Sequence, residues 1–250
     1  MSATNPGPGF VPGYPDPLDT LLPPEFRPMR PAGPGGPPPT SEPFFEPAWN
    51  GLRVLLAIEG TRWRLRTERG EDISRLFPDL VDVRQAVQPY AAVLDGEVVA
   101  EVAGRPDPDT LRQWLRIHGA PVLATRRGKA CAATPHTVLY LADILRIGNS
   151  WLLDVAWEDR RRILEAAVYG RPCVRLTPVT PRAHDLGPLA TDQGLAMLLA
   201  KGRRSRYLPG RRSREWQRLR LADLLCEAPA VLTARLAIGP AADPDGVPDG

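Results

Sequence analysis

The chain has 250 residues and a net charge of +3, with an apolar content that is ordinary for one large domain or two small ones. It contains no run of eighteen apolar residues and no basic, apolar and small-residue pattern at its N-terminus, so we expect a cytoplasmic protein with no membrane partner. Cys131, Cys173 and Cys226 lie far apart without C-x-x-C spacing, which favours reduced thiols over a zinc site.

Both ends of the chain are poor in large apolar residues. Residues 1–22 are rich in proline and glycine, so we predict that they are disordered, and residues 31–43 have a similar character. Residues 223–250 are expected to form a short helix and a loose tail. One folded domain over residues 23–222 remains.

The middle of the chain predicts a mixture of strands and helices. Residues 53–58 and 61–66 form a predicted hairpin through Glu59-Gly60. Helical spacing follows over 78–87, and residues 93–102 predict strand interrupted at Asp95-Gly96. Further along come a helix over 109–117 capped by Asp109, a buried strand over 138–145, a helix over 157–168, a strand over 174–176, and a helix over 192–199 that passes into a strand.

Several ordered segments carry recognisable motifs. Residues 46–53 are E-P-A-W-N-G-L-R and residues 94–99 are L-D-G-E-V-V. The others are T-E-R-G-E-D-I-S-R-L-F-P at 67–78, D-I-L at 143–145 with L-L-D and E-D-R-R after it, G-L-A-M-L-L-A-K at 194–201, and Y-L-P-G-R-R-S-R-E-W-Q-R-L-R at 207–220.

Together these motifs resemble the adenylation domain of ATP-dependent DNA ligases, especially the bacterial end-joining type. The resemblance implies an α+β, antiparallel-sheet nucleotidyltransferase fold and a role in DNA repair and recombination. It also implies ATP with Mg²⁺ or Mn²⁺ as cofactors, DNA as a partner, and an end-joining or ligase protein as a further partner. Because the chain ends soon after Arg220, we expect no oligonucleotide-binding barrel.

The first motif departs from the family at its chemical centre. Ala48 stands where the family has the lysine that attacks the α-phosphate of ATP, and Asn50 replaces an aspartate. The chain has only two lysines, and arginine cannot replace a lysine nucleophile because its guanidinium stays protonated. Lys129 lies in a predicted surface loop, and Lys201 matches a second family lysine that touches phosphate. No catalytic nucleophile is therefore predicted.

Three more family positions are changed. Ala196 replaces a glutamate that helps to hold metal, Ala142 replaces a phenylalanine that stacks on adenine, and Glu68 replaces an arginine that binds DNA phosphates. The predicted nucleotide-binding remnants are Glu46, Arg53, Glu97, Lys201, Arg218 and Arg220. Asp95 and Glu97 remain as a weak candidate metal pair, since a divalent ion needs several oxygen ligands.

Some retained residues also have a purely structural explanation. Gly51 and Gly96 are typical of turns that need backbone freedom. The aromatic rings of Trp49, Phe77 and Trp216 are expected to lie in the core rather than to stack on bases.

Positive charge gathers near the end of the domain. Residues 201–220 contain nine basic side chains and Glu215, a balance of +8, so the rest of the chain carries about −5. Such a patch indicates a nucleic-acid partner, and a solvated arginine-rich loop is the alternative. The predicted nucleic-acid-binding residues are Arg203, Arg204, Arg206, Arg211, Arg212 and Arg214.

These observations predict a ligase-type adenylation domain that is defective in self-adenylation. A non-catalytic nucleic-acid-binding or scaffold module of an end-joining system is one alternative. Sealing of DNA that is already adenylated is another, because that later step does not use the lysine. A noncovalent nucleotide sensor is the third.

Overall fold

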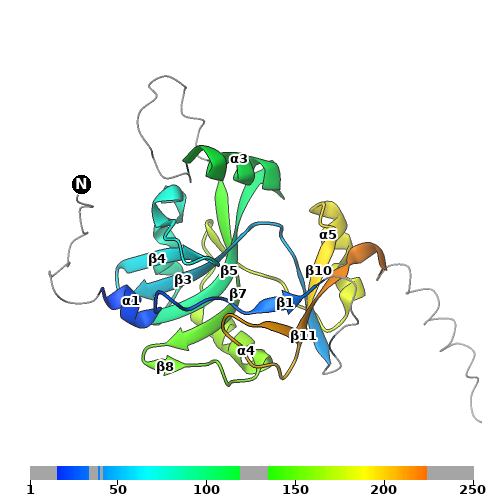
Figure 1. Cartoon of the computed structure of the whole chain (residues 1–250). Coiled ribbons are helices and arrows are strands. Elements are labelled where there is room, and N and C mark those ends of the chain that lie inside the picture. Colours follow the sequence, from blue (N-terminus) through cyan, green and yellow to red (C-terminus); the bar gives the residue numbers. More distant parts are fainter. Residues whose placement is uncertain (1–15, 34–38, 40–41, 119–134, 224–250) are drawn as a thin grey trace, which may run out of the picture.

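A computed structural model describes residues 16–33, 39, 42–118 and 135–223, which form two β-sheets with helices around them (Figure 1). The smaller sheet has the strand order β1-β11-β10-β2 and the larger has β4-β3-β5-β7-β8. Among the strand pairs of these residues, only β1–β11 and β7–β9 are parallel. This arrangement confirms the α+β, antiparallel-sheet expectation.

The strands of the smaller sheet are β1 (Arg30–Ala32), β2 (Pro43–Pro47), β10 (Met197–Gly202) and β11 (Arg212–Arg220). The larger sheet contains β3 (Leu52–Glu59), β4 (Arg62–Thr67), β5 (Ala91–Val102), β7 (Thr137–Ile147) and β8 (Ser150–Trp151), with β6 (Arg105–Pro106) paired to β5 and β9 (Val174–Leu176) paired to β7.

The α-helices are α1 (Pro17–Leu21), α2 (Val83–Ala86), α3 (Pro108–His118), α4 (Trp157–Ala167) and α5 (Gly187–Asp192). Short 3₁₀ turns are η1 (Ser74–Leu76), η2 (Pro78–Asp82) and η3 (Ala183–Leu186). No helix in these described segments is long and apolar enough to cross a membrane.

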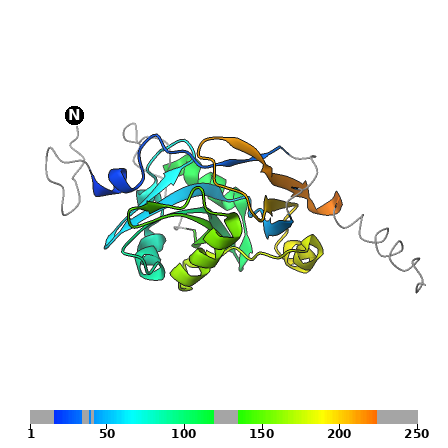
Figure 2. The same cartoon turned by 90° about the horizontal axis from the view of Figure 1, so that it is seen from below.

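The larger sheet is buried on both faces. Along β3, Val54 and Leu56 belong to a core cluster that includes Leu164 of α4, whereas Leu55 and Ala57 pack in a second cluster with Trp216 of β11. Since successive strand residues point to opposite faces, the sheet is the middle layer of the domain. Figure 2 shows α4 on one side of this sheet and β11 on the other.

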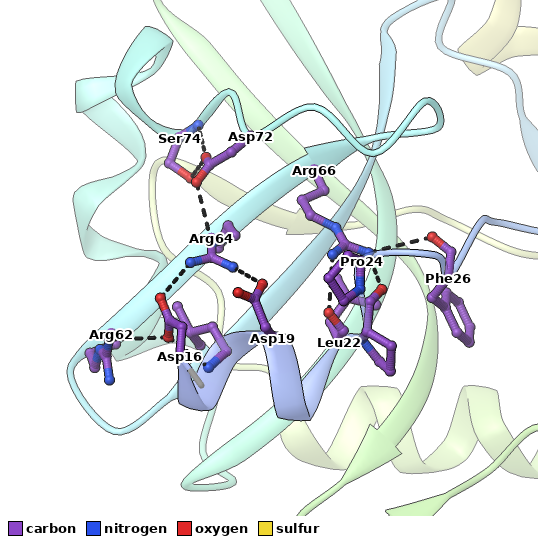
Figure 3. Close-up of polar contacts among 12 residues, drawn as sticks. Asp16, Asp19, Leu22, Pro24, Phe26, Arg62, Arg64, Arg66, Asp72 and Ser74 are labelled. Carbon is purple, nitrogen blue, oxygen red and sulfur yellow. Dashed lines mark hydrogen bonds and ion pairs between the residues drawn. The ribbon is translucent and has the colours of Figure 1, made fainter. Parts of the chain in front are cut away.

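Residues 16–22, which precede the predicted domain, are folded against it. Asp16 caps α1 by accepting a hydrogen bond from Leu18 N at 2.9 Å, and Leu18 and Leu21 are buried. Arg64 of β4 forms ion pairs with both Asp16 and Asp19 (Figure 3). The prediction of disorder over residues 1–22 is therefore wrong for residues 16–22, while residues 1–15 and 224–250 lie outside the described residues.

Two further arginines fix the main chain that follows α1. Arg66 donates to the carbonyl oxygen of Leu22 at 3.0 Å (Figure 3) and to that of Pro23 at 2.6 Å. Arg146 donates to the carbonyl oxygen of Leu21 at 2.8 Å. The chain then runs to β1 on the smaller sheet. We call residues 16–32 the N-terminal clasp, because they contact both sheets.

Several predicted elements differ in their bounds. The strand β5 is continuous through Asp95-Gly96, and the irregularity lies in its pairing with β7. Asp107, not Asp109, caps α3, because its Oδ1 accepts from the backbone N–H groups of Asp109 and Thr110 at 3.0 Å. The helix α5 ends at Asp192, where a helix was expected to begin.

Close packing explains the two motif glycines. A Cβ on Gly51 would lie 2.4 Å from the carbonyl oxygen of Val98, and a Cβ on Gly96 would lie 2.4 Å from that of Tyr140. Neither residue has a positive φ, so backbone approach rather than turn freedom requires glycine there. The prediction that the three aromatic residues lie in the core is confirmed, since Trp49, Phe77 and Trp216 are buried.

Replacing Gly96 with alanine should destabilise the domain by about 1–3 kcal/mol or more, because the added methyl group meets backbone that cannot move aside. Gly170→Ala is the matched control, since a Cβ at Gly170 meets nothing within 4 Å. Urea unfolding followed by circular dichroism measures both. Equal midpoints for the two variants would contradict the close-packing explanation.

Candidate functional site

The predicted nucleotide-binding residues come from adjacent strands of the two facing sheets. In the smaller sheet, Leu199 pairs with Glu46 on β2 and with Arg218 on β11. The next row, two residues along β10, pairs Lys201 with Trp216. Because alternate residues share a face, Glu46, Lys201 and Arg218 lie together on one face of this sheet.

Glu46 and Lys201 form a buried ion pair. Lys201 Nζ lies 2.8 Å from Glu46 Oε1 and 4.3 Å from the centre of the Trp216 ring, and both charged side chains are at most 5% exposed. Burial raises the pKa of Glu46 above its ordinary value, and the Lys201 ammonium opposes that shift. Glu46 Oε2 has no hydrogen-bond partner within the described part of the chain. The lysine is thus held by a carboxylate and an aromatic face.

Asp95 is the centre of a second buried network. Arg53 of β3 donates to it twice, from Nε at 3.0 Å and from Nη2 at 2.6 Å. The Tyr207 hydroxyl donates to Asp95 Oδ2 at 2.7 Å and accepts from Met29 N at 3.1 Å. Burial and the Asp95 charge raise the pKa of Tyr207 well above its ordinary value, so the hydroxyl stays protonated and able to donate.

Glu97 lies beside these residues on β5. Its Oε2 accepts from the Gly51 N–H at 3.1 Å. Burial raises its pKa, while the Gly51 hydrogen bond and the charges of Arg53 and Arg218 oppose the shift and Glu46 adds to it. The structure therefore gathers Glu46, Arg53, Glu97 and Arg218 in one electrostatic environment.

Ala48 and Ala142, two positions that differ from the family, lie next to these charged residues. Ala48 is half-buried at the end of β2, where its N–H donates to the Met197 carbonyl at 3.2 Å, and Arg220 pairs with Met197 from the other side. Ala142 is half-exposed and sits in the pairing irregularity between β5 and β7. At both positions the side chain ends at a methyl group, so neither supplies a nucleophile or an aromatic platform.

The candidate metal pair has other partners. Both oxygens of Asp95 are occupied by Arg53 and Tyr207, and Glu97 is bound to a backbone amide. Across the described residues, no group of three or more histidine, cysteine, aspartate or glutamate side chains is arranged to hold a metal ion. This arrangement does not fit a divalent ion, which needs several free oxygen ligands.

The motif analysis missed a buried support for the site. Arg160 of α4 donates to both oxygens of Asp143, at 2.9 and 2.8 Å, and neither side chain is more than 1% exposed. Arg160 also donates to the Ser205 carbonyl at 3.1 Å, which anchors the loop after β10. The E-D-R-R and D-I-L motifs contain both residues, but their pairing depends on how α4 packs against β7.

The arginine patch separates into paired and unpaired members. Arg203 binds Glu158 at 2.6 Å and Glu42 at 3.0 Å, and Arg206 lies 3.5 Å from Asp154. Arg212 donates to the Pro31 carbonyl at 2.8 Å. The exposed side chains that form no hydrogen bond or ion pair within the described segments are those of Arg204, Arg211, Arg214, Arg218 and Arg220.

The N-terminal clasp adds two basic residues to this surface. Arg30 N donates to the Arg211 carbonyl at 2.8 Å, and Gly210 N donates to the Arg27 carbonyl at 2.8 Å. Local sequence patterns do not predict this neighbourhood, because the parallel β1–β11 pairing joins segments from opposite ends of the domain.

Two facing antiparallel sheets with ligase-type motifs between them define a nucleotidyltransferase-like domain. The sequence model described as "ATP dependent DNA ligase domain" matches residues 39–220, so the chain belongs to the ATP-dependent DNA ligase family. It is 34% identical over 177 residues to DNA ligase C1 of Mycolicibacterium smegmatis. The aligned region covers 67% of this chain and 49% of that protein.

Other relatives support the same family. The multifunctional non-homologous end joining protein LigD of Mycobacterium bovis is 26% identical over 173 residues, covering 69% of this chain and 21% of that protein. Mycobacterial DNA ligase D, solved with ATP and MES, has a similar fold, with a TM-score of 0.60 at 24% identity over 79% of this chain and 60% of that one. The chain spans about half the length of DNA ligase C1 and a smaller share of LigD.

Replacing Lys201 with methionine should destabilise the domain by about 3–5 kcal/mol at neutral pH, because Glu46 would be a buried charge without a partner. The loss should shrink as the pH falls. The folded state binds a proton on Glu46 more readily than the unfolded chain does, so acidification towards 4.5 favours the folded state, and does so more strongly in the variant.

Urea unfolding at several pH values measures this dependence. The double variant Glu46→Gln/Lys201→Met is the control, and it should recover most of the loss because neither charge is left unpaired. A pH-independent loss in the single variant would argue against Glu46 as its cause.

Proposed function

We propose that this chain is a DNA ligase adenylation-type domain that does not adenylate itself and that contacts DNA through its basic surface. The observation that carries the first part is Ala48, which leaves the nucleophile position with a methyl group. Lys201 does not replace it, because its amine is held 2.8 Å from Glu46 Oε1 in a buried ion pair.

The surviving groups support at most weak nucleotide binding. Without an aromatic ring at Ala142, adenine has no stacking platform at that position, and Asp95 is engaged by Arg53. Arg218 and Arg220 keep positive charge on β11 and can still bind phosphate oxygens. ATP and Mg²⁺ or Mn²⁺ are therefore cofactors of the family that this domain uses poorly.

The basic surface supports DNA as the partner. Arg211 and Arg214 are exposed and form no ion pair within the described residues, so phosphates can bind them without first displacing a carboxylate. Relatives include a protein named for non-homologous end joining. We infer a module that holds broken DNA ends beside an active ligase or end-joining protein.

Incubation with labelled ATP and Mg²⁺ or Mn²⁺ should produce no covalent adduct, because Ala48 supplies no amine at the nucleophile position. Denaturing gels and intact mass spectrometry measure this. A species heavier by about 329 Da, the mass of an added AMP, would contradict the proposal whichever residue carried it. The variant Ala48→Lys alone should regain little, since Ala142 and Ala196 remain unchanged.

Duplex DNA should bind with little sequence preference and with an affinity that falls steeply as salt rises. Replacing the unpaired Arg211 and Arg214 with serine should flatten the slope of log affinity against log salt by up to about two units, one for each lost phosphate contact.

The matched control replaces Arg203 and Arg206, which already have carboxylate partners and should change the slope less. Fluorescence anisotropy over a salt series measures both variants. If the wild-type protein does not bind duplex at tens of micromolar, or if the Arg211 and Arg214 variant binds as well as wild type, the patch is only a solvated surface.

A further inference from the structure

A small groove lies where the N-terminal clasp meets the loop between β10 and β11. Its volume is about 280 Å³, and its lining residues are Pro23, Glu25, Phe26, Arg27, Pro209 and Gly210. Two prolines and one aromatic ring give it mainly apolar walls. The site between the two sheets does not include any of these residues.

The aromatic wall is fixed in place by stacking. The Phe26 ring lies parallel to the Trp151 ring, with centroids 5.0 Å apart and 9° between the planes. The Arg146 guanidinium lies 5.0 Å from the centre of Trp151 and donates to the clasp carbonyls of Thr20 and Leu21. Phe26 therefore needs little rearrangement to receive a flat ligand.

Positive charge borders the groove. Arg27 is held by its own chain, since Nη1 donates to the carbonyl oxygens of Pro24 at 2.5 Å and Phe26 at 3.0 Å. Arg30 and Arg211 are exposed and adjacent through the β1–β11 pairing. Glu25 is the only acid in the lining. An apolar slot with cationic edges is complementary to an aromatic group attached to phosphates.

We propose that this groove receives one unpaired nucleobase of a single-stranded DNA end, with the flanking phosphates on Arg30 and Arg211. The inference rests on the proposed DNA contact and adds a preference for ends with an overhang. The groove is at or below the lower end of the roughly 300–1,000 Å³ range of small-molecule sites, so it suits a single ring system. Bases inside a duplex remain stacked and do not enter, whereas bases of an overhang are free to stack on Phe26.

The test compares two labelled duplexes with equal numbers of phosphates, one blunt and one with a short single-stranded overhang. Wild-type protein should bind the overhang duplex more tightly. Phe26→Ala should weaken overhang binding by about 5- to 150-fold, the range for loss of one stacked base, and leave blunt-duplex binding unchanged. Phe26→Tyr keeps the ring and should behave like wild type.

A fluorescent base analogue in the overhang gives a second readout in the unmodified protein. Stacking on Phe26 should quench its emission, so the inference stays testable even if Phe26→Ala fails to fold. Equal binding of both duplexes by wild type, or an equal effect of Phe26→Ala on both, would overturn the base site and leave the proposed DNA contact intact. Absence of any DNA binding would overturn both.

Discussion

The buried carboxylate of Asp95 is the contact on which the two-sheet arrangement depends. It binds Arg53 on the neighbouring strand of the larger sheet and Tyr207 in the loop between β10 and β11 of the smaller sheet, and Tyr207 in turn accepts from Met29 of the clasp. A buried charge of this kind is tolerated only when its oxygens are satisfied. The three segments are thus held together by one side chain.

That constraint also determines what remains of the site. Two carboxylates that the family resemblance associates with nucleotide or metal form ion pairs inside the domain. Asp95 pairs with Arg53, and Glu46 pairs with Lys201. Among the described residues, exposed arginines without an ion pair remain on β11 and in the loop before it. This division of charge supports the proposal of weak nucleotide binding, no self-adenylation and contact with DNA.

The periodicity of apolar residues predicted the elements whose structure depends on neighbouring residues in the chain. Alternating apolar residues predicted the β3–β4 hairpin. Helix α1 was not predicted, because tertiary contacts stabilise it. These are the ion pairs with Arg64 of β4 and the burial of its leucines, which composition does not reveal. Likewise, composition does not distinguish the arginines of the patch from one another. In the fold, Arg203 forms ion pairs with Glu158 and Glu42.

The central claim, that the groups between the sheets are committed to one another rather than to a nucleotide, is tested most directly by isothermal titration calorimetry with ATP and Mg²⁺. The ion pairs of Glu46 with Lys201 and of Asp95 with Arg53 predict a dissociation constant on the order of millimolar. A dissociation constant of a few micromolar would contradict the account and would favour a nucleotide sensor instead.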